Sequence, residues 1–148
     1  MSYMWIVEGI AAGALAGAIM GAASEIGYRL RAFKSSLVII DGSFALRQLG
    51  RDPRGASTYV LGIAIHLATS SVFGIAYAVI ARLADFDPRM TAALVPYIAF
   101  LWLAMLFTAL PAAGQGILGR RIGRFAWAEQ LLLHVVYGIA FWWALGWM

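Results

Sequence analysis

Four stretches of this chain are apolar over at least the length needed to cross a lipid bilayer. A spanning helix takes about 20 residues at a rise of 1.5 Å each. The stretches are Met4–Leu30, Tyr59–Leu83, Thr91–Leu118 and Phe125–Trp147. Their apolar residues do not alternate with polar ones as they would in membrane strands. The sequence therefore predicts an all-α, polytopic membrane protein whose four transmembrane helices form one domain over residues 1–148.

The composition supports this prediction and excludes several classes of site. Hydrophobic residues make up 63% of the chain and charged residues 12%, whereas soluble domains average about 45–50% and about 25%. There is no cysteine, which excludes disulfides, thiolate metal sites and cysteine nucleophiles. No G-x-S-x-G motif is present either. We expect no enzymatic activity, no catalytic residues and no metal site, and the net charge of +4 lies in loops rather than on a nucleic-acid surface.

The basic residues predict an orientation. Nine of the eleven lysines and arginines lie in the first and third loops, and the other two, Arg82 and Arg89, lie in the second loop. Loops one and three share a side of the membrane when there are four spans. Because basic loops stay in the cytoplasm, we expect both termini on the outer, periplasmic side. The candidate lipid-headgroup residues in the basic loops are Arg47, Arg51, Arg54, Arg120, Arg121 and Arg124.

The first loop contains a candidate amphipathic helix. The segment Ser43–Gly50 has Ser43 as a possible N-cap and Gly50 as a stop. Its apolar side chains could rest on the cytoplasmic membrane interface while its arginines meet anionic headgroups; they are Phe44, Leu46 and Leu49, with Arg47 and Arg51. The alternative is a solvated basic loop. The short run Leu37–Ile40 is expected to tuck against the helix bundle.

The first span carries a glycine zipper. Gly9, Gly13, Gly17 and Gly21 recur at a spacing of four, which places them in one stripe along a helix. Missing side chains let another backbone approach closely, so we expect protein or a flat ligand to cover the stripe. The partner is either another helix of this chain, which we favour, or a neighbouring subunit.

Few polar side chains fall within the spans, and such residues are functional candidates by default. The candidates are His66, His134, Glu25, Glu129, Gln115 and Ser70, with Gln130 nearby and Glu8 on the outer side. Apart from Glu8, all lie in the predicted cytoplasmic half. They form one layer and not a track across the bilayer, which argues against a complete transport path.

Three interpretations of the two histidines remain open. The first is interhelical hydrogen bonding to Glu25, Glu129 or Ser70. The second is ligation of a tetrapyrrole, haem b or chlorophyll, by His66 and His134, for which nearby glycines would make room and the third-loop arginines would meet propionates. The third is a proton relay through glutamate and histidine.

Part of the chain resembles a known family. The pattern His66-x3-Ser70-x2-Phe73-x3-Tyr77 is followed by Pro88, by Pro111-x2-Gly114 and by Trp127-x-Glu129 leading to His134. Over about residues 60–145 these features resemble the YagU-like family of small bacterial inner-membrane proteins. The resemblance implies a multi-pass protein of the bacterial inner membrane in which His66, Glu129 and His134 matter. The family has no established reaction or cofactor, and a role in acid tolerance has been proposed for it.

The predicted function is non-enzymatic. A short chain with little soluble mass and no polar path fits an accessory subunit of a larger membrane complex, respiratory or photosynthetic, with other transmembrane subunits and membrane lipids as partners. The alternatives are a tetrapyrrole-binding protein that uses His66 and His134, and a small proton-linked transporter or acid-tolerance protein.

Overall fold

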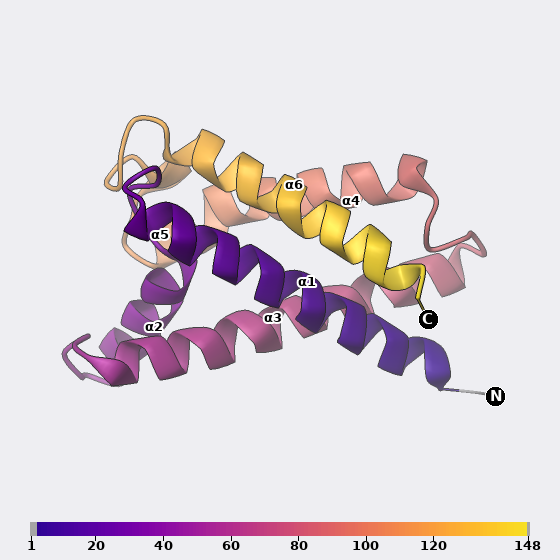
Figure 1. Cartoon of the computed structure of the whole chain (residues 1–148), viewed down its shortest axis with the longest axis horizontal. Coiled ribbons are helices and arrows are strands. Elements are labelled where there is room, and N and C mark those ends of the chain that lie inside the picture. The colour runs from indigo at the N-terminus through magenta and orange to yellow at the C-terminus, as the bar shows by residue number, and fades with distance from the viewer. Residues whose placement is uncertain (1–2, 148) are drawn as a thin grey trace.

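The computed structural model describes residues 3–147 and confirms four long apolar helices in an all-α fold. They are α1 (Met4–Arg29), α3 (Ala56–Leu83), a third span over Thr91–Ala112, and α6 (Ala126–Leu145). The helices run alongside one another with the N- and C-termini at the same end (Figure 1). Length and composition fit a multi-pass membrane protein. Which side of a membrane each end faces, and which membrane it is, stay predictions.

The two ends of the bundle differ in their charge, and we call them the terminal end and the basic end. The terminal end holds both termini and the short loop 84–90. The basic end holds the loops over 30–55 and 113–125, and these contain most of the lysines and arginines (Figure 1).

The third span is interrupted and shorter than predicted. It consists of α4 (Thr91–Ala104), a five-residue π-helix η1 (Met105–Ala109) and the short α5 (Leu110–Ala112). The π turn directly precedes α5, whose second residue, Pro111, has no N–H to donate back into that turn. A single π turn of this kind commonly lies beside a functional site.

The prediction that this span continues to Leu118 is wrong, because the backbone reverses after Ala112. Gly114 adopts φ 78°, and the next amide, of Gln115, donates to the carbonyl of Leu110 at 2.8 Å. This is the hydrogen-bond pattern of a Schellman motif, which ends a helix. The remaining residues form a loop with one 3-10 turn, η2 (Ile117–Gly119).

The predicted loop helix exists but begins earlier and faces protein. Helix α2 runs from Leu37 to Gln48, with Ser36 at the N-cap position and Gly50 at φ 66° after its end. Ser43 is therefore a buried residue inside the helix, and its predicted capping role is wrong. The apolar run at residues 37–40 forms the first turn because it packs into the bundle. Leu46 is likewise buried and does not rest on lipid.

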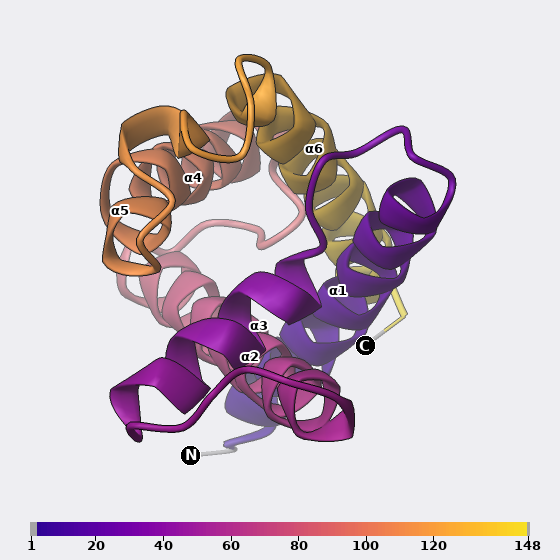
Figure 2. The same cartoon turned by 90° about the vertical axis from the view of Figure 1, so that its left-hand side faces the viewer.

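Glycines let α3 approach both α1 and α2 closely. The zipper of α1 lies against α3 of the same chain, where a Cβ on Gly9 would come within 2.9 Å of the Gly74 carbonyl oxygen. A Cβ on Gly62 would collide with the Val38 carbonyl of α2. Viewed from the basic end, α2 lies over α3 (Figure 2). At these positions the helix backbones contact each other directly, with no side chains between them.

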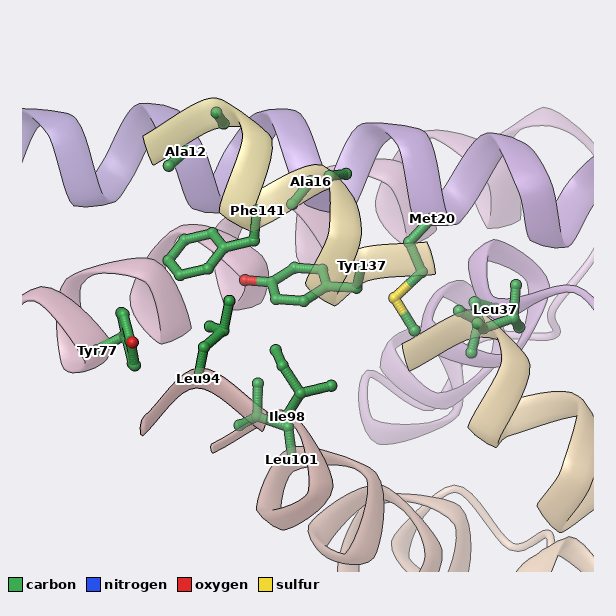
Figure 3. Close-up of a cluster of buried hydrophobic side chains, with 13 residues drawn as sticks. Ala12, Ala16, Met20, Leu37, Tyr77, Leu94, Ile98, Leu101, Tyr137 and Phe141 are labelled. Carbon is green, nitrogen blue, oxygen red and sulfur yellow. The ribbon is translucent and has the colours of Figure 1, made fainter. Parts of the chain in front are cut away.

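The main apolar core lies between α1, α3, α4 and α6 (Figure 3). Tyr77 and Phe141 meet edge to face with ring centroids 5.5 Å apart, and Tyr137 stacks on Phe141 at 5.7 Å. Helices α3 and α4 make hardly any close backbone contact. They are joined by a side chain instead, since the Tyr97 hydroxyl donates to the Phe73 carbonyl at 2.6 Å.

Candidate functional site

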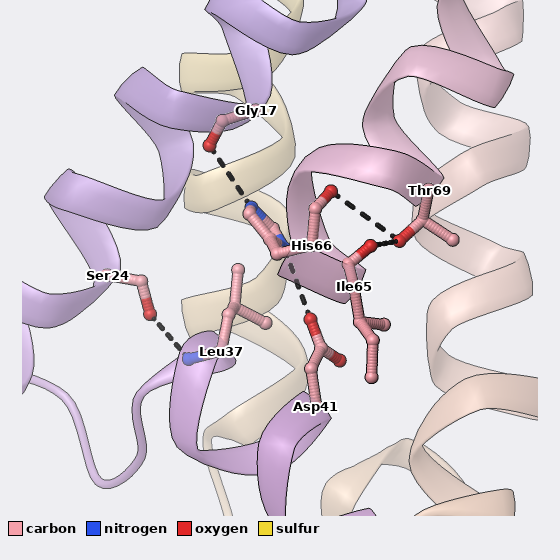
Figure 4. Close-up of polar contacts among 7 residues, drawn as sticks. All are labelled: Gly17, Ser24, Leu37, Asp41, Ile65, His66 and Thr69. Carbon is pink, nitrogen blue, oxygen red and sulfur yellow. Dashed lines mark hydrogen bonds and ion pairs between the residues drawn. The ribbon is translucent and has the colours of Figure 1, made fainter. Parts of the chain in front are cut away.

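The most connected polar side chain inside the bundle is His66 on α3 (Figure 4). Its Nδ1 lies 3.2 Å from Oδ2 of Asp41 on α2, and its Nε2 lies 3.1 Å from the backbone oxygen of Gly17 on α1. Gly17 has no side chain, which leaves its carbonyl within reach of the imidazole. One ring therefore ties three helices together.

The partners of His66 determine how many protons the pair holds. A carbonyl oxygen only accepts, and a carboxylate only accepts unless it is protonated. Both contacts of His66 are hydrogen bonds only when the His66–Asp41 pair holds two protons. These protons lie on the two ring nitrogens, or on Nε2 and the carboxyl group. In either state neither ring nitrogen offers a free lone pair.

Asp41 was not among the candidates from the sequence, because it lay in a segment assigned to a loop. One signal could have found it. Asp41 stands four residues after Leu37, which puts the two on one face of a helix. The same apolar run that was expected to tuck against the bundle therefore carries a carboxylate inward with it, and an inward carboxylate needs a partner.

His134 on α6 is buried and makes a different hydrogen bond. Its Nδ1 lies 2.8 Å from the backbone oxygen of Gln130. Since that oxygen accepts, Nδ1 carries the proton, and in the neutral ring Nε2 is then an acceptor. Within residues 3–147 no hydrogen bond is made by this Nε2.

The expected partners of the histidines lie elsewhere. Glu25 pairs with Arg29, at 2.7 Å, and Glu129 accepts from the backbone N–H of Lys34 at 3.0 Å. Glu129 thus links the first loop to α6, Glu25 pairs within α1, and neither carboxylate contacts a histidine. Gln115 is half-buried in the loop after the third span.

Ser70 lies between α3, α1 and α6 and forms no hydrogen bond with a histidine. A Cβ on Gly17 would collide with its side chain, and its backbone oxygen accepts from the Tyr137 hydroxyl at 3.3 Å. Ser70 therefore helps to dock α3 against both α1 and α6.

Both histidines line one cavity of about 170 Å³ in the half of the bundle near the basic end. Its walls come from five segments, α1, α2, α3, the third span and α6. The polar lining is Asp41, His66, Thr69, Ser70, Thr108, His134 and Tyr137, and the rest is apolar. This is the arrangement of a ligand site, apolar with a few convergent polar groups.

The cavity opens sideways, between α3 and the π-helix. The lining residues on that side are exposed: Thr69 and Phe73 on α3, Thr108 and Ala109 on η1. The two threonine hydroxyls at this mouth donate to backbone oxygens four residues earlier, Thr69 to Ile65 and Thr108 to Ala104. Polar groups beside lipid must be satisfied internally, so this mouth suits an entry from the bilayer.

His134 also borders a second hollow. An apolar groove of about 540 Å³ runs between α4 and α6 on the outside of the bundle, with His134 beside Leu131 and Gly138 in its lining. The imidazole of His134 thus separates the groove from the cavity.

The geometry does not fit a tetrapyrrole held by both histidines. Both nitrogens of His66 are already hydrogen-bonded, and a metal ligand must offer a lone pair. A cavity of about 150 Å³ holds a molecule the size of benzene, so 170 Å³ takes one six-membered ring and not a macrocycle.

The six candidate headgroup arginines all lie at the basic end. Some are already engaged: Arg54 pairs with Asp52 at 2.9 Å, Arg121 donates to the Gly114 carbonyl, and Arg124 stacks over Phe125. Arg47 donates through Nε to the Ser43 backbone oxygen. Arg51 and Arg120 are exposed.

Comparison with family models, with curated proteins and with solved structures finds no match to this chain. The resemblance to the YagU-like family therefore stays a prediction from the residues quoted above.

Proposed function

We propose that this chain is a membrane-embedded binding protein for a small lipophilic molecule with a hydroxylated ring, such as an alkylphenol or a hydroquinone. The ring would enter the cavity from the bilayer between α3 and η1. The observation that carries the proposal is that two side-chain atoms of the cavity lining which accept hydrogen bonds have no partner within residues 3–147, in a space the size of one ring.

The acceptors are two. His134 Nε2 has no hydrogen-bond partner among the described residues, and neither has the second carboxyl oxygen of Asp41, Oδ1. His66 offers nothing to a ligand because Asp41 and Gly17 occupy it. A ligand that donates from a hydroxyl satisfies such a site, whereas a ligand that only accepts leaves both acceptors unpaired. The apolar walls would hold the ring itself.

A pair of nearly identical probes tests the proposal. The full chain is reconstituted in phosphatidylcholine nanodiscs, and its thermal unfolding is followed with 4-hexylphenol or its methyl ether, 4-hexylanisole. We expect saturable stabilisation by the phenol that exceeds that by the ether about tenfold in apparent affinity, the value of one good hydrogen bond.

Two variants complete the test. His134→Leu nearly keeps the volume of the side chain but removes the acceptor, and should reduce the tenfold preference to near unity. Ser57→Ala, in an exposed first turn away from the cavity, should leave it unchanged. Equal stabilisation by phenol and ether would contradict the proposal, because the cavity would then act only as an apolar space.

The accessory-subunit role is compatible with this site and stays a prediction. Lipophilic hydroquinones are the chemical class that respiratory and photosynthetic membranes exchange between complexes. Purification from a native membrane in mild detergent would support a subunit role if a partner accompanies the chain in fixed stoichiometry. A homogeneous lone monomer would contradict it. The proton-linked alternative has no relay through Glu25 or Glu129, because neither carboxylate contacts His66 or His134.

A further inference from the structure

A second, polar pocket lies at the basic end, apart from the cavity. It has a volume of about 220 Å³ and surrounds the start of α2. Its polar lining offers mainly hydrogen-bond donors: Tyr28, Lys34, Ser35, Ser36, Ser43, Arg47 and Gln115. Neither histidine and none of the zipper glycines lines this pocket.

Two buried hydroxyl groups in this pocket have no partner. Ser36 is 1% exposed, and its Oγ makes no hydrogen bond; the Oγ of the neighbouring Ser35 is also buried without a partner. Ser36 occupies the N-cap position of α2 yet does not cap it through its side chain. A serine there normally accepts from the helix backbone. A buried hydroxyl left unpaired costs free energy, which a bound acceptor would recover.

The helix itself adds to the donors. The first amides of a helix have no partner within it, and its dipole favours negative charge there. In α2 the amide of Leu37 donates to the Ser24 hydroxyl at 2.9 Å, and Ile39, whose amide is another of these, lines the pocket. Helix start, hydroxyls and cations thus converge on one small space.

The surrounding charges favour an anion. Lys34 and Arg47 both line the pocket. The Arg47 Nε donates to Ser43, so its two terminal nitrogens remain for a ligand. Two carboxylates lie nearby, and neither lines the pocket. Glu129 accepts from the Lys34 backbone. Glu25 lies close to Ser36. Its Oε1 pairs with Arg29 at 2.7 Å, and its Oε2 is buried and makes no hydrogen bond of normal geometry.

We infer that this pocket binds a phosphate group, either on a membrane lipid headgroup or as the free ion. Lys34 and Arg47 supply the charge, and the hydroxyls of Ser35 and Ser36 with the first amides of α2 supply the remaining donors. The pocket opens where the predicted lipid headgroups would lie, at the end of the bundle rich in basic residues.

The experiment uses the full chain in phosphatidylcholine nanodiscs with two probes. In one arm the discs contain 20 mol% phosphatidic acid, and lipid retention is read by native mass spectrometry on release. In the other arm, inorganic phosphate is titrated against thermal unfolding, with chloride at matched ionic strength. Retained phosphatidic acid without a response to phosphate assigns the site to a lipid, and saturable stabilisation by phosphate assigns it to the free ion.

Variants separate the site from general charge. Ser36→Ala and Lys34→Gln should each weaken the responding probe about tenfold, as expected for a charge-assisted hydrogen bond. Ser36→Ala removes no hydrogen bond of normal geometry, so the variant should fold. Arg51→Gln removes an exposed charge at the same end, outside the pocket, and should change binding less than twofold. No response to either probe, or equal losses in Arg51→Gln and Lys34→Gln, would overturn the inference.

Discussion

At the scale of single residues, the contact between His66 and Asp41 joins α3 to α2. From the sequence alone, Asp41 is expected in a loop that faces lipid or solvent. Neither residue would be stable alone in an apolar bundle. Together they satisfy each other at 3.2 Å, and Gly17 completes the set. The pair therefore specifies how α2 docks against α3, in addition to lining the cavity.

A double-mutant cycle tests this pairing. Asp41→Ala and His66→Ala should each destabilise the fold, and their coupling free energy should be about 1 kcal/mol, the usual size for a hydrogen bond between membrane helices. The measurement is reversible unfolding of the purified chain in mixed micelles. The exposed pair Asp52–Arg54 serves as the control, with coupling near zero. Additive effects at Asp41 and His66 would show that the contact carries no stability.

The close contact of Gly74 on α3 with α1 gives a second prediction, on stability, at this scale. Gly74→Ala should destabilise by about 2 kcal/mol, because the added Cβ would collide with the Gly9 backbone oxygen and the helices must separate. Gly138→Ala is the matched control on α6. Its Cβ would meet only side-chain atoms of Ile98, the nearest at 3.2 Å, so the cost should stay under about 1 kcal/mol. Unfolding in the same micelles measures both, and equal effects would contradict close backbone contact at Gly74.

The regular spacing of the glycines made the zipper predictable. The hydrogen-bond partners of His66 could not be predicted. Four glycines at one spacing identify a stripe whatever covers it. The partners of His66 come from residues 25 and 49 positions away, and no local pattern encodes such distances. The histidines, Ser70 and the glycines were thus found from the sequence, but Asp41 was not.

At the scale of elements, α2 differs most from its prediction. Sequence periodicity located an amphipathic helix near residues 43–50 and its stop at Gly50, which the positive φ of Gly50 confirms. The start was placed too late, because an apolar run too short to span was treated as separate from the helix. Its apolar side packs on α3 and not on lipid, so the helix is part of the bundle.

A pair of leucine substitutions distinguishes these two placements. Leu46→Ala removes a side chain that is 2% exposed, and should destabilise by about 2 kcal/mol or more through the cavity left behind. Leu49→Ala, at 65% exposed, should cost under about 0.5 kcal/mol. Chemical unfolding of the two variants gives the comparison. If Leu46→Ala unfolded no more easily than Leu49→Ala, α2 would not pack on the bundle and the interfacial placement suggested by the sequence would hold.

At the scale of the whole molecule, the distribution of charge predicts the orientation of the bundle in the membrane. The fold puts both termini at one end and the basic loops at the other (Figure 1), as four spans require. The charge bias then predicts that the basic end faces the cytoplasm.

Because the chain has no cysteine, a single substitution to cysteine gives one labelling site that reports this orientation. In intact bacterial cells, a membrane-impermeant maleimide should label the Asp85→Cys variant, at the terminal end, and not the Arg51→Cys variant, at the basic end. Both should be labelled after the membrane is permeabilised. Labelling of Arg51→Cys alone in intact cells would show that the termini face inward.

The sequence by itself determined the class of the protein, the number of spans and the residues that could not face lipid without a partner. These are properties of composition and local period, and the bilayer imposes them on each segment separately. Only the tertiary structure decided where the third span ends, which carboxylate meets His66, and that two histidines and the π turn enclose a cavity. Those features depend on contacts between segments far apart in the chain, where the fit of backbone to backbone decides which polar groups meet.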